Sequence, residues 1–408
     1  MLSVNEAEEI ILSLVRGLDP NQDTETISLT AANGRILAEP VTGKLDVPHW
    51  NNSAMDGYAV GYADVQDCNA THPITLNVVT EIAAGDRPST KIEPGQAARI
   101  FTGAMLPEGA DTIIIQENTQ RKGDQVTVFS APEPEEFVRH QGAFYQAGTP
   151  LLAAGITIGA AEIAVLATAQ CSQLLVYRRP RVAILSTGDE LVTPEQPLQP
   201  GQIVDSNQYA LASFVTNNGG IPLKLGIVRD RPEELQQAIS TAISTADIVL
   251  STGGVSVGDY DYIDSILAKL GGTLHIRNVA VKPGKPLTVA TFDNHCLYFG
   301  IPGNPVSALV SCWRFVQPAL RKLSGQQNYL PCLVNAITRH DLKAAGKRET
   351  YLWGQLYLVD GKYEFVLAGG SHSSGNLINL AQTNGLAIIP VGQKLISGGK
   401  QVKVMLVN

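Results

Sequence analysis

The sequence predicts a multidomain protein of the α/β plus β class, with a doubly wound α/β domain at its centre. Three observations predict it. Between residue 182 and about residue 323, short apolar runs alternate with helical patterns, which is typical of a parallel sheet covered by helices. The flanking stretches contain short alternating runs separated by Gly and Pro, as in small β domains. The chain has 408 residues, 44% of them hydrophobic, which is enough for several cores.

The first part of the chain predicts a discontinuous scaffold domain interrupted by a small β domain. Residues 1–44 begin with a helix whose apolar stripe includes Val4, Ile11 and Leu14. A second helical stretch at 160–169 is expected to return to this segment, so we assign 1–44 and 139–176 to one scaffold and dimerisation domain. Between them, strand-like runs at 74–79, 97–101, 112–116 and 125–129 predict a small β domain over 45–138.

The remainder predicts the α/β domain, over 177–325, and a C-terminal β barrel, over 326–408. Strands are expected at 182–186, 222–228, 247–250, 287–291 and 296–299, with helices at 208–217, 232–244 and 262–270. A last helix should run from Pro305 to Leu320, with Asn304 able to cap it. In the tail, strand-like runs fall at 330–337, 349–359, 365–367, 386–390 and 402–407.

Composition excludes several classes of protein. A formal charge of −8 argues against nucleic-acid binding, although a local basic pocket remains compatible with a small anion. No run approaches the roughly 18 apolar residues of a spanning helix, and the first residues are acidic where a secretory signal would be basic, so we expect a cytoplasmic protein. The five cysteines are scattered and odd in number, which favours reduced packing residues. His49 and His372 are expected to be surface or packing residues.

Three predicted strands end in segments suited to binding an anion and a metal ion. The run 247–250 leads into Ser251-Thr-Gly-Gly-Val-Ser-Val-Gly-Asp-Tyr-Asp261, where adjacent glycines can direct N–H groups at an anion and the acids can hold a hard cation such as Mg²⁺. Taken alone, a glycine turn followed by acids is also a common way to end a strand. The other two strands lead into Thr187-Gly-Asp-Glu190 and Ile301-Pro-Gly-Asn-Pro305. Because ligands of open α/β sheets bind outside the carboxyl ends of the strands, the recurrence predicts one shared ligand site.

Seven segments together resemble the molybdopterin molybdenumtransferase family, and also the E domain of gephyrin. They are Asn52-Ser-Ala-Met-Asp-Gly-Tyr-Ala59, Phe101-Thr-Gly-Ala-Met105, Ser186-Thr-Gly-Asp-Glu-Leu191, Asp205-Ser-Asn207, Ser251-Thr-Gly-Gly-Val-Ser-Val-Gly-Asp259, Lys282-Pro-Gly-Lys-Pro286 and Gly300-Ile-Pro-Gly-Asn-Pro-Val-Ser307. They occur in the family's order over nearly the whole chain. This makes the resemblance far more specific than any single glycine loop.

The resemblance implies a homodimeric enzyme that inserts molybdate into adenylylated molybdopterin, assisted by Mg²⁺, and releases AMP and molybdenum cofactor. The catalytic candidates are Asp56, Glu190, Asp259, Lys282 and Lys285, and the metal candidates are Glu190, Asp259 and Asp189. The substrate-binding candidates are Ser53, Thr102, Thr187, Asp205, Gly253, Gly254, Ser256, Pro286, Pro302, Asn304, Arg348 and Ser371. Asp56, Ser53 and Thr102 lie in the small β domain, so the resemblance implies that they complete the site across a subunit boundary. Asp189 and Asp205 could equally cap a helix or a turn.

One departure from the family pattern bears on activity. The family commonly has Arg and then Gly-Glu-Asp before the return to the scaffold, whereas this chain has Arg139-His-Gln-Gly142-Ala143-Phe144 and lacks both acids. A molybdopterin-binding scaffold or carrier is therefore one alternative function. Molybdopterin adenylyltransferase is the other, because its α/β domain is similar, and that enzyme is also a possible partner protein. The additional β domains favour insertion.

Overall fold

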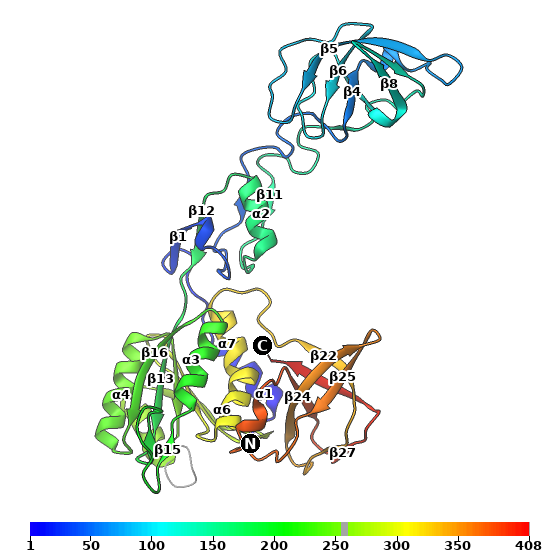
Figure 1. Ribbon diagram of the computed structural model, residues 1–408. Helices are drawn as coiled ribbons and strands as arrows, with labels where there is room; N and C mark the ends of the chain where they lie inside the picture. The colour runs from blue at the N-terminus through cyan, green and yellow to red at the C-terminus, as the bar shows by residue number, and fades with distance from the viewer. Residues whose placement is uncertain (254–259, 408) are drawn as a thin grey trace.

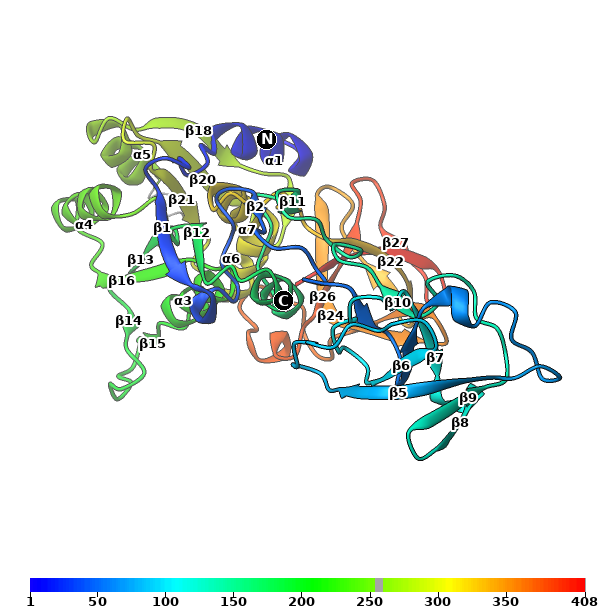
Figure 2. The ribbon, with the colours of Figure 1, turned by 90° about the horizontal axis from the view of Figure 1, so that it is seen from above.

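The computed structural model describes residues 1–253 and 260–407. Figure 1 shows an elongated molecule in which the α/β unit and the C-terminal barrel lie side by side at one end. Above them is a small unit formed by two separate stretches of chain, 24–42 and 150–177, called the two-part unit here. The small β unit lies at the far end. Figure 2, seen from above, shows the N-terminal helix α1 beside the α/β unit. The predicted multidomain α/β plus β architecture is confirmed, and no helix of the described residues is long and apolar enough to span a membrane.

The α/β unit contains a six-stranded sheet in the order β16-β13-β17-β21-β20-β18. Strands β16 (Ile221–Val228), β13 (Arg181–Thr187), β17 (Ile248–Thr252) and β21 (Leu297–Ile301) are parallel, whereas β20 (Pro286–Thr291) and β18 (Thr273–Asn278) are antiparallel to their neighbours. Helices α3 (Asn207–Asn217), α6 (Pro305–Ser311) and α7 (Gln317–Leu323) contribute to the core on one face of the sheet, and α4 (Pro232–Thr245) and α5 (Tyr260–Lys269) to that on the other.

Strand β13 shows why this sheet is covered on both faces. Val182 and Ile184 belong to the core shared with α3 and α6, while Ala183 and Leu185 belong to the core shared with α4 and α5. Side chains alternate between the two faces of a strand, so an unbroken apolar run requires apolar cover on both. The continuous run that predicted a buried strand therefore corresponds to a doubly wound sheet.

The last helix differs from the prediction. A π-helical segment, Cys312–Val316, separates α6 from α7. Pro318 has no N–H and cannot donate a bond that a regular α-helix would need there. Asn304 precedes α6, but its side chain makes no capping bond and its Nδ2 instead donates to Ser374 Oγ at 3.2 Å.

Helix α1 (Val4–Leu14) packs in a different place from the one expected. Its capping box pairs Ser3 with Glu6, and its buried residues Val4, Ala7 and Ile11 join the core that also contains the α/β unit and one face of the barrel. The prediction grouped this helix with the scaffold segment. Burial of its apolar stripe against the larger core explains the difference.

A buried polar network, called the Arg314 network here, joins α1, the π-helical segment and the barrel. Arg314 pairs with both carboxylate oxygens of Glu8, and its Nε donates to Tyr351 Oη at 2.9 Å. Tyr351 in turn donates to Glu349 Oε1 at 2.6 Å. Burial raises the pKa of Tyr351, so its hydroxyl stays protonated and able to donate. Three elements distant in sequence are thereby held in one geometry.

The C-terminal barrel closes through the long strand β24 (Glu349–Val359), which pairs with both β25 (Lys362–Leu367) and β26 (Gly385–Ile389). Strands β22 (Leu333–Thr338) and β28 (Gln401–Leu406) complete the ring of five. Short strands β23 (Leu342–Lys343) and β27 (Leu395–Ile396) pair beside it. The predicted barrel is therefore present.

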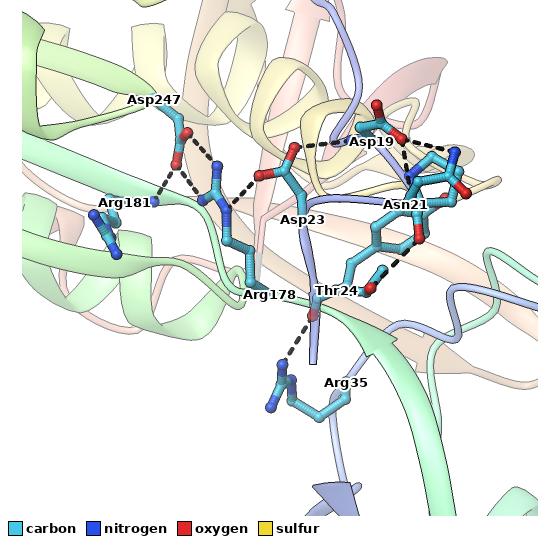
Figure 3. A network of polar contacts seen from close by, with 10 residues as sticks. Asp19, Asn21, Asp23, Thr24, Arg35, Arg178, Arg181 and Asp247 are labelled. Atoms are coloured by element: carbon cyan, nitrogen blue, oxygen red, sulfur yellow. Dashed lines mark hydrogen bonds and ion pairs between the residues drawn. The ribbon is translucent and has the colours of Figure 1, made fainter. Parts of the chain in front are cut away.

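The two-part unit combines the chain segment before the small β unit with the segment after it. Strand β1 (Thr24–Ser28) pairs with β12 (Gln173–Tyr177), β2 (Val41–Thr42) pairs with β11 (Pro150–Leu152), and α2 (Ala160–Thr168) contributes Leu166 to their common core. Figure 3 shows how this unit is joined to the α/β unit. Arg178 donates to Asp23 at 2.8 Å and to both oxygens of Asp247 at 2.7 and 2.8 Å.

The small β unit has its own six-stranded sheet, in the order β7-β4-β6-β5-β9-β8. The strands are β4 (Gly57–Val60), β5 (Ile74–Ile82), β6 (Gln96–Ile100), β7 (Thr112–Ile115), β8 (Thr119–Lys122) and β9 (Gln125–Val128), and a short pair, β3 (Asn52–Ser53) with β10 (Val138–Arg139), lies at its base. A Cβ on Gly57 would lie 1.9 Å from Ile114 O, so only glycine fits there.

Candidate functional site

A cavity of about 860 Å³ lies between the α/β unit and the barrel. It brings together segments that are far apart in the sequence: the ends of the parallel strands, the turn between β19 (Val281–Lys282) and β20, and two loops of the barrel. Of the sequence candidates, its lining includes Thr187, Glu190, Gly253, Lys282, Lys285, Pro286, Pro302, Asn304 and Arg348. Its volume is that of a small-molecule site.

The strand ends form the floor of this cavity. Strands β13, β17 and β21 are parallel, so Thr187, Gly253 and Pro302 emerge at the same edge. Thr187 is 4% exposed and its Oγ1 has no hydrogen-bond partner among the described residues. Gly253 has a φ of +88°, and a Cβ there would lie 2.3 Å from Thr187 O. The chain can therefore approach Thr187 closely only with glycine at this position.

The turn carrying Lys282 and Lys285 is attached to the barrel. Strand β19 pairs in parallel with β24, and Arg348 Nη1 donates to Val281 O at 3.2 Å. Gly284 turns the chain with a φ of +103°, and a Cβ there would lie 2.8 Å from the buried Ser311 Oγ. The arrangement places three cationic side chains, from two units of the fold, around one cavity. Such a group suits a tetrahedral oxyanion.

Carboxylates reach the cavity from the α/β unit. Glu190 and Asp230 line it, and the Glu190 side chain lies over Gly188, where a Cβ would come within 2.7 Å of Oε2. Asp189 is exposed and is not among the lining residues. Carboxylate oxygens are the ligands that Mg²⁺ prefers, so Glu190 and Asp230 fit a hard cation. The described residues contain no group of three His, Cys, Asp or Glu side chains that could hold a metal ion alone.

Three sequence candidates, Gly254, Ser256 and Asp259, lie outside the described residues. Asp205 is described and is 4% exposed, but its Oδ1 accepts a bond from the backbone N–H of Gln208 at 3.2 Å, at the start of α3. Asp205 does not line the cavity, whereas its neighbour Asn207 does. Asn207 Nδ2 donates to Gly303 O at 2.7 Å and so joins two of the strand-end loops.

The serine-rich turn of the barrel packs against the start of α6. The backbone N–H of Val306 donates to Ser374 O at 3.2 Å. Ser373 and Ser374 line the cavity, but the predicted Ser371 does not. His372 also lines it, with its ring 4.6 Å from that of Trp353 and its Nε2 2.8 Å from Ala368 O.

Asp56, Ser53 and Thr102 belong to the small β unit and do not line this cavity. Figure 1 shows the small β unit at the far end of the molecule from the α/β unit and the barrel. Asp56 Oδ1 accepts bonds from Thr102 Oγ1 and from its backbone N–H, both at 2.7 Å. These bonds lower the pKa of Asp56, which keeps it ionised at neutral pH. The Ser53 hydroxyl donates to Met55 O at 2.6 Å. Within one chain, the Asp56–Thr102 pair is therefore separate from the cavity.

Ala143 and Phe144, which stand where the family commonly has two acids, also lie away from the cavity. Phe144 is 70% exposed, and its backbone N–H donates to Val47 O at 2.8 Å, in the connection between the small β unit and the two-part unit. The cavity lining includes neither Ala143 nor Phe144.

Sequence reasoning missed Asp230, Lys343 and Trp353 at this cavity. Asp230 could have been found, because it follows strand β16 at the same sheet edge as the other loops. Lys343 and Trp353 come from the barrel, and no pattern in the sequence shows which face of the barrel meets the α/β unit.

Comparisons with known proteins cover almost the whole chain. Residues 2–169 match the MoeA N-terminal region (domain I and II), residues 183–322 match a probable molybdopterin binding domain, and residues 335–407 match the MoeA C-terminal region (domain IV). Among solved structures, a molybdopterin biosynthesis MoeA protein from Pyrococcus horikoshii OT3 is similar with a TM-score of 0.86 and 27% identity, each chain being fully covered.

Curated relatives agree with these matches. A molybdopterin molybdenumtransferase from Nostoc sp. is 60% identical over 99% of this chain and 94% of its own length. One from Haemophilus influenzae is 34% identical over 99% of this chain and 98% of its own length. The chain belongs to the molybdopterin molybdenumtransferase family.

Proposed function

We propose that this protein is a transferase of molybdenum cofactor biosynthesis that inserts molybdate into adenylylated molybdopterin and releases AMP. One observation carries the proposal: a single cavity collects carboxylates from the strand ends of the α/β unit and cationic side chains from the β19–β20 turn and the barrel. Molybdate and the phosphates of a nucleotide are anions, and such a site can bind both while also holding a cation. The names of the related proteins support the same reaction.

At the basic side, we assign molybdate to Lys282, Lys285 and Arg348. Two ammonium groups and a guanidinium can donate several charge-assisted hydrogen bonds to the oxygens of one tetrahedral ion. Pro286 follows Lys285 in the same turn and also lines the cavity. Binding here would hold molybdate next to the substrate that receives it.

At the acidic side, Glu190 and Asp230 would hold Mg²⁺, with Asp259 as the further candidate from the family resemblance. A cation held by these carboxylates would supply neutralisation of the phosphate charge of the substrate. We assign to the Thr187 hydroxyl a bond to a substrate oxygen, which is supported by its burial without a partner among the described residues and by its place in the cavity lining. Cleavage of a phosphoanhydride depends mainly on positioning and charge neutralisation, which these groups provide.

We further propose that the working unit is a cytoplasmic homodimer, in which Asp56 and Thr102 of the partner subunit face this cavity. The support is that Asp56 is ionised and held by Thr102, yet lies in a unit remote from the cavity of its own chain. Light scattering should give the mass of a dimer. A monomeric mass at assay concentration, with full activity, would contradict this assembly.

The function is tested by giving the purified chain three mixtures. We expect AMP and molybdenum cofactor from adenylylated molybdopterin with molybdate, and little of either when molybdate is left out. Unmodified molybdopterin with ATP should give no product. Product from that third mixture would instead support an adenylyltransferase, and tight binding of the adenylylated substrate without AMP release would support a carrier.

Gly284→Ala should weaken molybdate binding by about tenfold, because the new Cβ would meet Ser311 Oγ and the turn with its two lysines must shift. Equilibrium titration with molybdate measures this. Gly219→Ala is the matched control, since Gly219 has a φ of +80° but no atom within 4 Å of the added Cβ. Equal loss of molybdate affinity in both variants would show that general backbone strain, and not the turn, is responsible.

A further inference from the structure

The cavity holds more positive charge than the assigned molybdate contacts account for. Among the described residues that line it, the cationic side chains outnumber the carboxylates by four to two. The cations are Lys282, Lys285, Lys343 and Arg348, and the carboxylates are Glu190 and Asp230. The protein as a whole has a formal charge of −8. Positive charge is therefore concentrated here although the molecule as a whole is negative, which is typical of an anion site. Lys282, Lys285 and Arg348 are assigned to molybdate, so Lys343 is the cation that has no assigned role.

The backbone of Lys343 is held firmly. Lys343 pairs with Leu395 between β23 and β27, and the N–H of Ala344 donates to Lys394 O at 2.9 Å. The preceding residue, Leu342, is fully buried in the barrel core. Neighbouring residues of a strand point to opposite sides, so burial of Leu342 directs Lys343 away from the barrel core. This orientation agrees with its place in the cavity lining.

Within residues 1–253 and 260–407, no ion pair joins the ammonium group of Lys343 to a carboxylate. Among the described residues, the same is true of Lys282 and Lys285. Several unpaired cations around one cavity repel one another, and a bound anion relieves that repulsion. In the part of the chain that the structure describes, the barrel thus presents to this cavity a positive charge that no ion pair neutralises.

We propose that Lys343 is a further oxyanion-binding residue, which contacts an anionic substrate from the barrel side of the cavity. The identity of the anion rests on the proposed function. Its chemistry is that of a tetrahedral oxyanion, supplied either by free molybdate or by a phosphate of the adenylylated substrate. Lys343 then adds a contact from the barrel to the two lysines of the β19–β20 turn.

The test is equilibrium binding of molybdate, and separately of inorganic pyrophosphate, to the full-length chain at constant ionic strength. Lys343→Gln should weaken binding of at least one of the two by about tenfold, the usual effect of losing a charge-assisted hydrogen bond. Lys347→Gln is the matched control, because Lys347 is exposed in the connection that follows β23 but does not line the cavity. Its affinity for either anion should stay within about twofold of the unmodified chain, since only screened long-range charge is lost.

Each outcome decides the question. Weaker binding of molybdate alone identifies molybdate as the anion, weaker binding of pyrophosphate alone identifies the substrate phosphate, and weaker binding of both identifies a contact shared by the two. Unchanged affinities in Lys343→Gln, or equal losses in Lys343→Gln and Lys347→Gln, would overturn the proposal. These measurements need no turnover, so absence of AMP release would overturn the proposed function while leaving this result intact.

Discussion

Glu190→Gln is expected to lower molybdate-dependent AMP release on the order of 100-fold while the chain remains folded. Glu190 is exposed, lines the cavity at the end of β13 and contributes one of the two carboxylates found there among the described residues. Replacing a carboxylate by an amide of the same shape removes the negative charge and leaves the packing unchanged. Initial rates of AMP release at saturating substrate, with circular dichroism to confirm folding, measure the effect.

Asp189→Asn provides the matched comparison for this prediction. Asp189 is the adjacent acid, but it lies outside the cavity lining, so its loss should cost much less activity. Raising the Mg²⁺ concentration should restore part of the activity of Glu190→Gln if the carboxylate holds the cation. Equal losses in both variants, with no response to Mg²⁺, would show that Glu190 has no special part in the site.

Arg314→Met should destabilise the protein by about 3 kcal/mol, as expected when one partner of a buried ion pair is removed. The Arg314 side chain is 9% exposed, and its loss removes the ion-pair partner of Glu8 and the donor to Tyr351 Oη. Calorimetric unfolding should show a lower melting temperature for the transition that includes α1 and the barrel. Because Tyr351 lines the cavity, substrate affinity should fall as well.

Arg231→Met is the control for a surface ion pair. Arg231 and Glu234 are 61% and 45% exposed and 3.4 Å apart, so this substitution should cost less than about 1 kcal/mol. A melting temperature for Arg314→Met no lower than that for Arg231→Met would contradict the stabilising role of the Arg314 network.

The sequence predicted the α/β unit well because its strands are continuous apolar runs and its helices are amphipathic. Strand β18 was missed, since its sequence, Thr-Leu-His-Ile-Arg-Asn, is largely polar and lies at the edge of the sheet. The place of α1 could not be inferred either. An apolar stripe shows that a helix is buried on one side, but it does not identify the partner, and α1 packs against residues more than 250 positions away.

The candidate site was predictable where its residues follow parallel strands. Thr187, Glu190 and Pro302 were found by that rule, and Asp230 satisfies it too. Lys343 and Trp353 were not predictable, because their presence depends on how the barrel docks. Asp205 illustrates the alternative that the sequence left open, since its Oδ1 accepts a bond from the backbone N–H of Gln208 at the start of α3.

The most direct test of this account is a crystal structure of the protein with molybdate bound, using the anomalous scattering of molybdenum to locate the ion. We expect one strong peak in the cavity between the α/β unit and the barrel, within hydrogen-bond reach of Lys282, Lys285 and Arg348. A peak in the small β unit beside Asp56, or elsewhere with this cavity left free of molybdenum at saturating molybdate, would contradict the central claim.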